Sequence, residues 1–164
     1  MWEKIRDVMN SHAYMSEIER DKQRIQSTAE HFTPTDLVLE MIERTGVERF
    51  GAGKTVLDPA CGDGQFLMAV KCVKVYMHQM SEQEALQDIY GVDIMRDNVD
   101  LCKKRLGGGT ILMGDSLNTN VRLEGQTDNE YYELQRLYHG VDIEEFCVEG
   151  GSSKAHRVGR CGSK

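Results

Sequence analysis

The chain has 164 residues, of which 40% are hydrophobic and 29% are charged, and its formal net charge is −7. This length suits one domain, and this share of apolar residues is enough for a packed core. No run of about 18 apolar residues occurs, and the N-terminus lacks the apolar stretch of a secretory signal. We therefore expect a cytoplasmic protein with no membrane contact.

The charge distribution and the cysteine spacing limit which ligands and which compartment we expect. Residues 151–164 carry four basic residues and no acidic one, so with a total of −7 the rest of the chain carries −11. An acidic body repels phosphates at long range, which disfavours unaided binding to duplex DNA. The five cysteines show no CxxC spacing, so we expect no metal site and a reducing compartment.

The first 30 residues have a helical composition. Residues 1–30 are polar and rich in helix formers, which predicts one or two helices. Their thin apolar stripe consists of Ile5, Met9, Met15, Ile18 and Ile25.

A second helix is expected at 35–45, where Thr33, Pro34 and Asp36 are typical of a helix start, with Thr or Asp as the cap. Gly46 is typical of its end. The apolar residues expected to share its buried face are Leu37, Val38, Met41 and Ile42.

Strand-like and helical segments then alternate. Strands are expected at 54–58, 89–94 and 111–115, helices at 65–76 and 97–106, and a polar connection with one or two helical turns at 81–88. The order β-α-β-α-β predicts parallel strands with right-handed crossovers. Beyond residue 117 we expect a helix at 128–138, a short strand that could form at 143–148, and a disordered tail at 151–164.

The strongest chemical signal is the segment VLDPACGDGQFL at 56–67, in which a strand leads through a Gly-rich turn into a helix. Gly62 and Gly64 would let the backbone approach a ligand. Asp58, Asp93 and Asp115 end the three strands, and ligands bind outside the carboxyl ends of parallel strands. A glycine pair alone fits a tight turn in any α/β protein, and one Asp alone often just ends a strand. Three acids without a phosphate-binding lysine favour a nucleoside ligand that carries positive charge.

Two segments together resemble a known family. EHFTP at 30–34 and DPACGDGQFL at 58–67 are similar to the S-adenosylmethionine-dependent DNA adenine-N6 methyltransferases, especially phage and type I restriction-modification modification subunits. The resemblance covers about residues 27–117. It implies a Rossmann-like class I methyltransferase sheet, here partial, with three to four parallel strands. The implied organisation is a helical segment at 1–30, a cofactor-binding α/β core at 31–118, a helix and additional strand at 119–150, and a flexible basic tail at 151–164.

The resemblance also implies S-adenosylmethionine as the cofactor and assigns roles in binding it. Thr33 and Pro34 would touch its methionine end, and Asp58 would face the ammonium group. Asp93 would hold the ribose hydroxyls, Ile94 would pack on the adenine, and Asp115 would accept from the adenine amino group. The matched cofactor motif consists of Asp58, Ala60, Gly62 and Gly64.

The family's catalytic motif, Asn/Asp-Pro-Pro-Tyr/Phe, is absent, because the only prolines are Pro34 and Pro59. The sequence thus resembles a member truncated before that motif, and its catalytic residues stay unassigned. Glu149 lies near the expected place, but a carboxylate does not reproduce the amide's donor and acceptor geometry. We expect a chain that needs another polypeptide for catalysis or is inactive alone. The alternatives are a non-catalytic cofactor-binding or interaction protein acting on a host methylation system, and a methyltransferase for a small molecule or protein.

Partners follow from the same resemblance. In the family's sheet the first strand is central, so without the later strands it becomes an open apolar edge that tends to find a partner. We expect a second polypeptide or a homodimer there, with DNA reached through the partner. Phe32 could stack on the cofactor, although an aromatic beside a helix start more often packs. Cys61 is expected to be a small buried residue rather than a nucleophile.

Overall fold

The computed structural model describes residues 1–12 and 33–140. Several expectations therefore lie outside the described residues. They concern the helical stripe beyond Met9, Phe32, the strand at 143–148, Glu149, and the tail at 151–164.

The centre of the fold is a parallel sheet in the order β1-β2-β3. Its strands are β1 (Val56–Asp58), β2 (Ile89–Asp93) and β3 (Thr110–Met113). This confirms the expected α/β architecture with a partial parallel sheet. β1 begins two residues later than expected, whereas β2 and β3 end one and two residues earlier than expected, where the chain turns at their carboxyl ends.

The helices follow the expected order closely. They are α1 (Trp2–Ser11), α3 (Thr35–Thr45), α4 (Gln65–Met77), α5 (Glu82–Gln87), α6 (Arg96–Leu106) and α7 (Asp128–His139), with a 3-10 turn η2 at Val47–Phe50. α5 supplies the helical turn expected in the polar connection, and Ser81 and Glu84 begin it by bonding each other's backbone amides. None of the described helices is long and apolar enough to cross a membrane.

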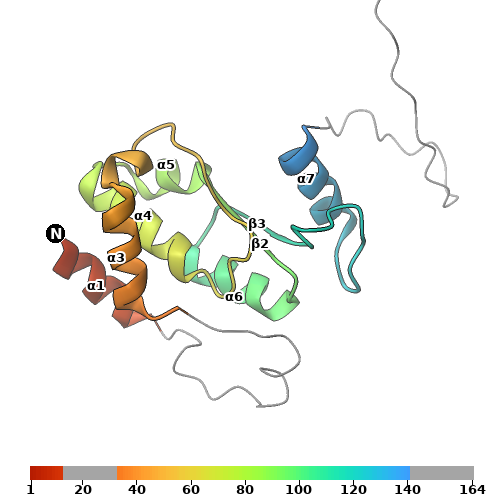
Figure 1. Cartoon of the computed structure of the whole chain (residues 1–164), viewed down its shortest axis with the longest axis horizontal. Coiled ribbons are helices and arrows are strands. Elements are labelled where there is room, and N and C mark those ends of the chain that lie inside the picture. Colours follow the sequence, from red (N-terminus) through yellow and green to blue (C-terminus); the bar gives the residue numbers. More distant parts are fainter. Residues whose placement is uncertain (13–32, 141–164) are drawn as a thin grey trace, which may run out of the picture.

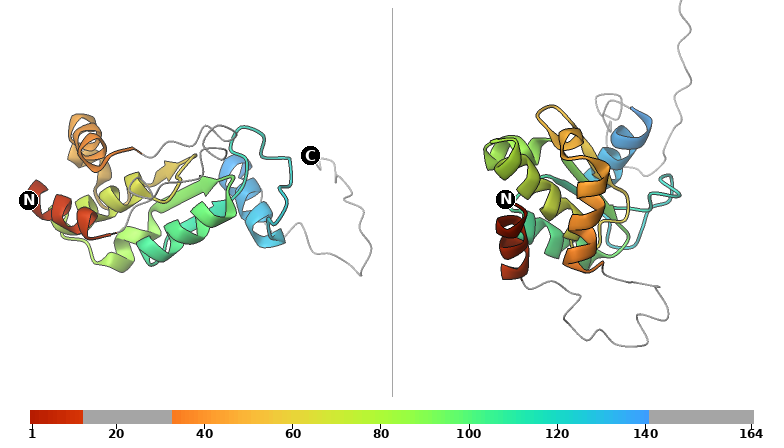
Figure 2. Two further views of the ribbon diagram at one scale, coloured as in Figure 1. Left: turned by 90° about the horizontal axis from the view of Figure 1, so that it is seen from below. Right: turned by 60° about the vertical axis from the view of Figure 1, so that its left-hand side comes forward.

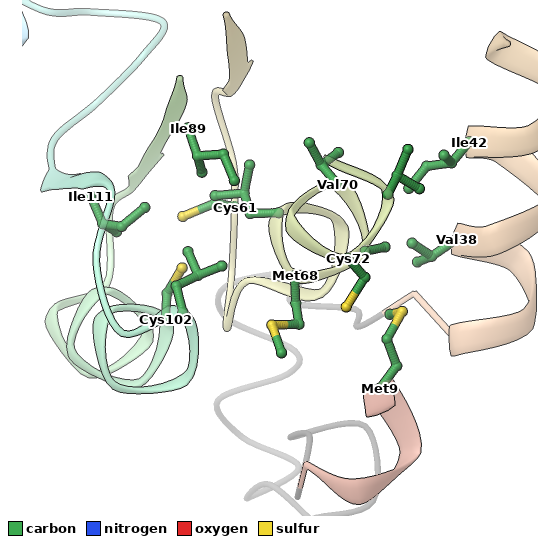
Figure 3. Packing of buried hydrophobic residues seen from close by; sticks show 14 of the residues in the cluster. Met9, Val38, Ile42, Cys61, Met68, Val70, Cys72, Ile89, Cys102 and Ile111 are labelled. Carbon is green, nitrogen blue, oxygen red and sulfur yellow. The ribbon is translucent and has the colours of Figure 1, made fainter. Parts of the chain in front are cut away.

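The main core lies on one face of the sheet, around α4. This helix is apolar on nearly all sides because α1, α3, α6 and β2 surround it. Figure 3 shows α4 between α3 and the strands, with Val70 facing Ile42 and Met68 near Met9. Ile5 and Met9 of α1 are fully buried, which confirms the described part of the N-terminal stripe.

α7 covers the other face of the sheet. Its Leu134 packs against Val92 of β2 and Leu112 of β3, in a small second core. Alternating strand residues point to opposite faces, which is why Val92 and Leu112 meet α7 while Gly91 and Ile111 meet the main core. α7 therefore lies across the strands from α4 and α6 (Figure 1), on the opposite side of the molecule from α1 (Figure 2).

The start and the buried face of α3 differ from expectation. Pro34 occupies the N-cap position, and no side chain caps the helix, so neither Thr33 nor Asp36 has the expected capping role. Leu37 and Met41 are 45% and 47% exposed, because α1 and α4 cover only the part of α3 that carries Val38, Leu39 and Ile42. The end at Gly46 is as expected, with a φ of 94°.

The outer edge of β1 is not paired with any described strand. Leu57 is 38% exposed there. Beside it lies a largely apolar groove of about 290 Å³, whose lining includes Met41, Phe50, Val56 and Phe66. The exposed Met41 of α3 therefore continues the apolar surface of this edge.

Lys74 is the largest side chain that is fully buried among the described residues. Its Nζ donates to the carbonyl oxygens of Gly51 (3.2 Å) and Lys54 (2.8 Å) and to Asp88 Oδ2 (3.2 Å). These three bonds satisfy the buried ammonium group and tie the segment before β1 to α4 and to the start of β2. Lys74 thus fixes where β1 enters the sheet.

Candidate functional site

A Gly-rich turn at residues 59–64 joins β1 to α4 at the carboxyl end of the sheet. Gly62 and Gly64 both adopt positive φ, 53° and 90°, which side chains rarely allow. A Cβ on Gly64 would also lie 2.6 Å from the Sγ of Cys102 on α6. Gly64 therefore lets the start of α4 pack closely on α6.

Asp93, the last residue of β2, holds this turn in place. Its Oδ2 accepts from the backbone amide of Gly62 at 2.9 Å. Its Oδ1 accepts from the amide of Met95 at 2.8 Å and from Nδ2 of Asn98 at 3.2 Å. A carboxylate offers about four acceptor positions, so three are used within the protein. Asp93 thus ties the turn after β1 to the start of α6.

A buried ion pair ties the same turn to α6. Asp63 is 1% exposed, and its carboxylate pairs with Arg105 of α6, whose side chain is 6% exposed. The guanidinium also donates to the Asp63 carbonyl oxygen at 3.4 Å. The two residues are 42 positions apart, so no local sequence pattern predicts this pair.

These elements enclose a pocket of about 580 Å³. The residues that line it are Thr33, Asp58, Pro59, Ala60, Cys61, Gly62, Asp63, Gln65, Phe66, Asp93, Ile94, Met95, Asn98, Asp115, Ser116 and Leu117. Most of the residues singled out from the sequence meet here. Pro34, the N-cap residue of α3, and Gly64, which faces Cys102, do not line the pocket.

The three predicted carboxylates lie along the pocket wall. Asp58 and Asp93 end β1 and β2, whereas Asp115, expected to end the third strand, lies two residues beyond the end of β3. Burial raises the pKa of Asp58, and the nearby Asp93 carboxylate raises it further, while a hydrogen bond from the Ala60 amide opposes the change. Asp115 lies in a turn beyond β3, where its Oδ1 accepts from the amides of Leu117 (2.9 Å) and Asn118 (3.1 Å).

The turn beyond β3 is fixed to the turn beyond β1. Ser116 Oγ donates to the carbonyl oxygen of Pro59 at 2.7 Å. This bond joins the rims of the pocket across the sheet, and the residues involved are 57 positions apart. Ser116 was not among the predicted site residues, because a serine after a strand has no distinctive spacing.

Two further lining residues, Gln65 and Asn98, were also missed. Gln65 is the first residue of α4 and Asn98 lies in the first turn of α6, and both are buried. A polar residue directly after a Gly-rich turn, at the first position of the expected helix, is the sequence signal that could have identified Gln65.

Cys61 is 5% exposed, as expected for a small core residue. A hydrogen bond with Cys102 and burial raise the pKa of its thiol far above the usual range, so it stays protonated. A protonated thiol is a poor nucleophile. Among residues 1–12 and 33–140, no group of His, Cys, Asp or Glu side chains is placed to hold a metal ion.

The chemistry of the pocket favours a particular class of ligand. Its described lining contains four aspartates and neither lysine nor arginine; Asp63 is paired with Arg105, which leaves Asp58, Asp93 and Asp115 as carboxylates without an ion-pair partner in the lining. Such a wall repels phosphate groups and attracts ammonium and hydroxyl groups. Its volume is typical of small-molecule sites. The residues present therefore fit a positively charged nucleoside such as S-adenosylmethionine.

Comparison with known proteins agrees with this geometry. The family model described as N-6 DNA Methylase matches residues 6–109. The match includes β1, β2, the Gly-rich turn and the helices between them, and it ends one residue before β3. No solved structure matches the chain.

Proposed function

Because the chain belongs to the N-6 DNA methylase family, we propose that it binds S-adenosylmethionine in the pocket at the carboxyl end of its sheet. The observation that carries this proposal is the wall of aspartates beside a Gly-rich turn fixed by Asp93. When bound, this cofactor supplies an electrophilic methyl group for transfer to an acceptor nitrogen.

The proposed roles of the side chains follow from their positions. Asp58, half-buried and near Asp93, would pair with the ammonium group. Asp93, with one acceptor position left, would bind a ribose hydroxyl while it keeps the turn in place. Ile94 is 50% exposed and offers an apolar surface for the adenine ring. Asp115 would accept a hydrogen bond from the amino group of that ring. Thr33, at the pocket wall, would border the methionine end, and Pro34 would hold Thr33 there as the first residue of the turn into α3.

We propose that catalysis requires a second polypeptide that carries the missing catalytic motif. The unpaired edge of β1 supports this, because Leu57 and the adjoining apolar groove offer a surface where a strand could add. DNA would then be contacted through that polypeptide, which suits the acidic charge of this chain. The sequence of residues 30–34 favours a chain that is related to phage and type I modification subunits. We therefore propose that it acts in the cytoplasm.

Calorimetric titration of the purified chain with S-adenosylmethionine tests cofactor binding. We expect a micromolar dissociation constant, and we expect Asp93→Asn to weaken it by about 10- to 100-fold, since charged hydrogen bonds are lost. Asp100→Asn, an exposed position on α6, removes the same charge and is the matched control. No heat with millimolar cofactor would contradict the proposal.

Absence of methyl transfer despite tight binding would favour the alternative, a non-catalytic cofactor-binding protein. The observation that supports this alternative is the absence of a Pro-Pro motif from the sequence. Transfer of labelled methyl to DNA upon addition of a partner chain would exclude it. Transfer that resists nuclease would indicate a protein or small-molecule acceptor.

A further inference from the structure

Gln65 has one hydrogen-bonding group that the described protein does not satisfy. The side chain is 5% exposed and lines the pocket. Its Nε2 donates to Thr35 Oγ1 at 2.8 Å, whereas its Oε1 has no hydrogen-bond partner among the described residues. Buried side-chain oxygens are nearly always bonded, because an unsatisfied one loses its bond to water without replacement.

In the structure the amide nitrogen of Gln65 is directed toward Thr35 and its oxygen is left without a partner among the described residues. With Nε2 held by the hydroxyl at the start of α3, the oxygen is the group left for a ligand. A ligand that satisfies Gln65 must therefore bring a donor.

The position of Gln65 indicates which part of the cofactor supplies that donor. Through Thr35, Gln65 lies on the side of the pocket nearest α3, where Thr33 is also found. Asp93 and Asn98 come from β2 and α6, and Figure 3 shows α3 and α6 on opposite sides of α4. If Asp93 binds the ribose, the amino-acid end of the cofactor points toward Gln65, and its only strong donor is the ammonium group.

We propose that Gln65 is a cofactor-binding residue whose Oε1 accepts a hydrogen bond from the ammonium group of S-adenosylmethionine, with Thr35 as the positioning residue. Gln65 thereby distinguishes ligands with an intact amino-acid group from those without it. This inference rests on the proposed function and adds a specificity determinant to the same pocket.

The test compares two ligands on the full chain and on Gln65→Met. S-adenosylhomocysteine carries the ammonium group, and 5′-methylthioadenosine lacks the whole amino-acid part. We expect Gln65→Met to weaken S-adenosylhomocysteine by about 10-fold and to leave 5′-methylthioadenosine within about twofold. We also expect the ligand-free variant to be as stable as wild type or more so, since an unsatisfied buried oxygen is replaced by an apolar group.

Two further variants sharpen the result. Thr35→Val keeps Oε1 but releases the amide, so we expect a smaller loss, about two- to threefold, for S-adenosylhomocysteine alone. Gln65→Glu keeps an acceptor and adds negative charge, so we expect affinity for S-adenosylhomocysteine to be retained or increased. A loss as large as that of Gln65→Met would mean that Gln65 faces the ligand's carboxylate, which would overturn the inference.

The remaining outcomes separate this inference from the proposed function. If wild type binds neither ligand, the proposed function fails and this inference fails with it. If wild type binds both and Gln65→Met binds both equally well, this inference alone is wrong. An equal loss for both ligands, or a drop in stability of the ligand-free variant, would show a purely structural role and would also overturn it.

Discussion

Asp58 combines two properties that make cofactor binding sensitive to pH. Burial raises its pKa above the ordinary 3.8, and the Asp93 carboxylate adds to that effect. An acid whose pKa is raised on folding takes up protons more readily in the folded state, so it costs stability as pH rises through that range. A bound ammonium group would offset this cost by favouring the ionised form.

We therefore expect the affinity for S-adenosylhomocysteine to fall as pH is lowered from neutral toward about pH 4, because Asp58 must lose its proton to pair with the ammonium group. Calorimetry across this range measures it. Asp58→Asn should bind more weakly at neutral pH and lose most of the pH dependence. If Asp58→Asn keeps the wild-type pH profile, Asp58 does not face the ammonium group.

The site residues that could be predicted from the sequence are those whose position follows from the end of a strand. Asp58, Asp93 and Asp115 each follow an apolar run, and parallel strands place their carboxyl ends at one edge. The partners of the buried polar residues were not predictable. Thr35 and Gln65 are 30 positions apart, and only the packing of α3 on α4 brings them together.

At the scale of elements, Glu130 joins two helices. It completes a capping box with Thr127 at the start of α7, and its carboxylate accepts from Arg96 of α6 at 2.8 and 2.6 Å. Lys103 of α6 lies 3.2 Å away. Burial opposes ionisation of Glu130, but these hydrogen bonds outweigh it and hold its pKa well below the usual range.

Glu130→Gln should lower the free energy of unfolding by about 2 kcal/mol at neutral pH, because bonds to a charged group are lost. The lowered pKa means that this contribution is present above the ordinary value of 4.5 and is lost as pH falls toward the folded-state pKa. Urea unfolding at neutral and acidic pH measures both.

Glu133→Gln removes the same charge from the same helix and is the matched control. Within residues 1–12 and 33–140, the ion pair of Glu133 is a local one with Arg136, three residues away, so we expect a change below about 1 kcal/mol. Equal effects of the two substitutions would mean that the link between α6 and α7 adds nothing beyond general electrostatics.

Helices and strands were predicted well where the spacing of apolar residues agreed with the glycines that mark turns and helix ends. Gly46 ends α3, α6 ends at Leu106, and α4 begins right after the Gly-rich turn, as expected. The buried face of α3 was predicted only in part. Leu37 and Met41 belong to the apolar face by periodicity, but whether a face is buried depends on its neighbours, and these two residues have no described helix or strand over them.

At the scale of the whole molecule, the main exposed feature of the described fold is the unpaired edge of β1. Open apolar edges promote association. In the absence of a partner polypeptide, we expect the purified chain to self-associate at micromolar concentration, and we expect Leu57→Lys to shift it toward monomer. Chromatography with light scattering measures the mass.

Val121→Lys is the matched control, since Val121 is similarly exposed (44%) but lies in the segment after β3. It should leave the mass of the assembly unchanged. A monodisperse wild-type monomer at micromolar concentration would count against association through β1, as would an equal response of the two variants.

The sequence by itself determined the order of elements, the parallel sheet, the Gly-rich turn and the aspartates at the strand ends. These depend on local periodicity, on glycine conformation and on the rule that parallel strands end at one edge. Tertiary structure alone decided which buried polar groups pair. Lys74 with Asp88, Arg105 with Asp63, and Gln65 with Thr35 meet across different elements. The physical reason is that a buried polar group must find its partner in space, and nothing in the local sequence specifies residues that only packing brings into contact.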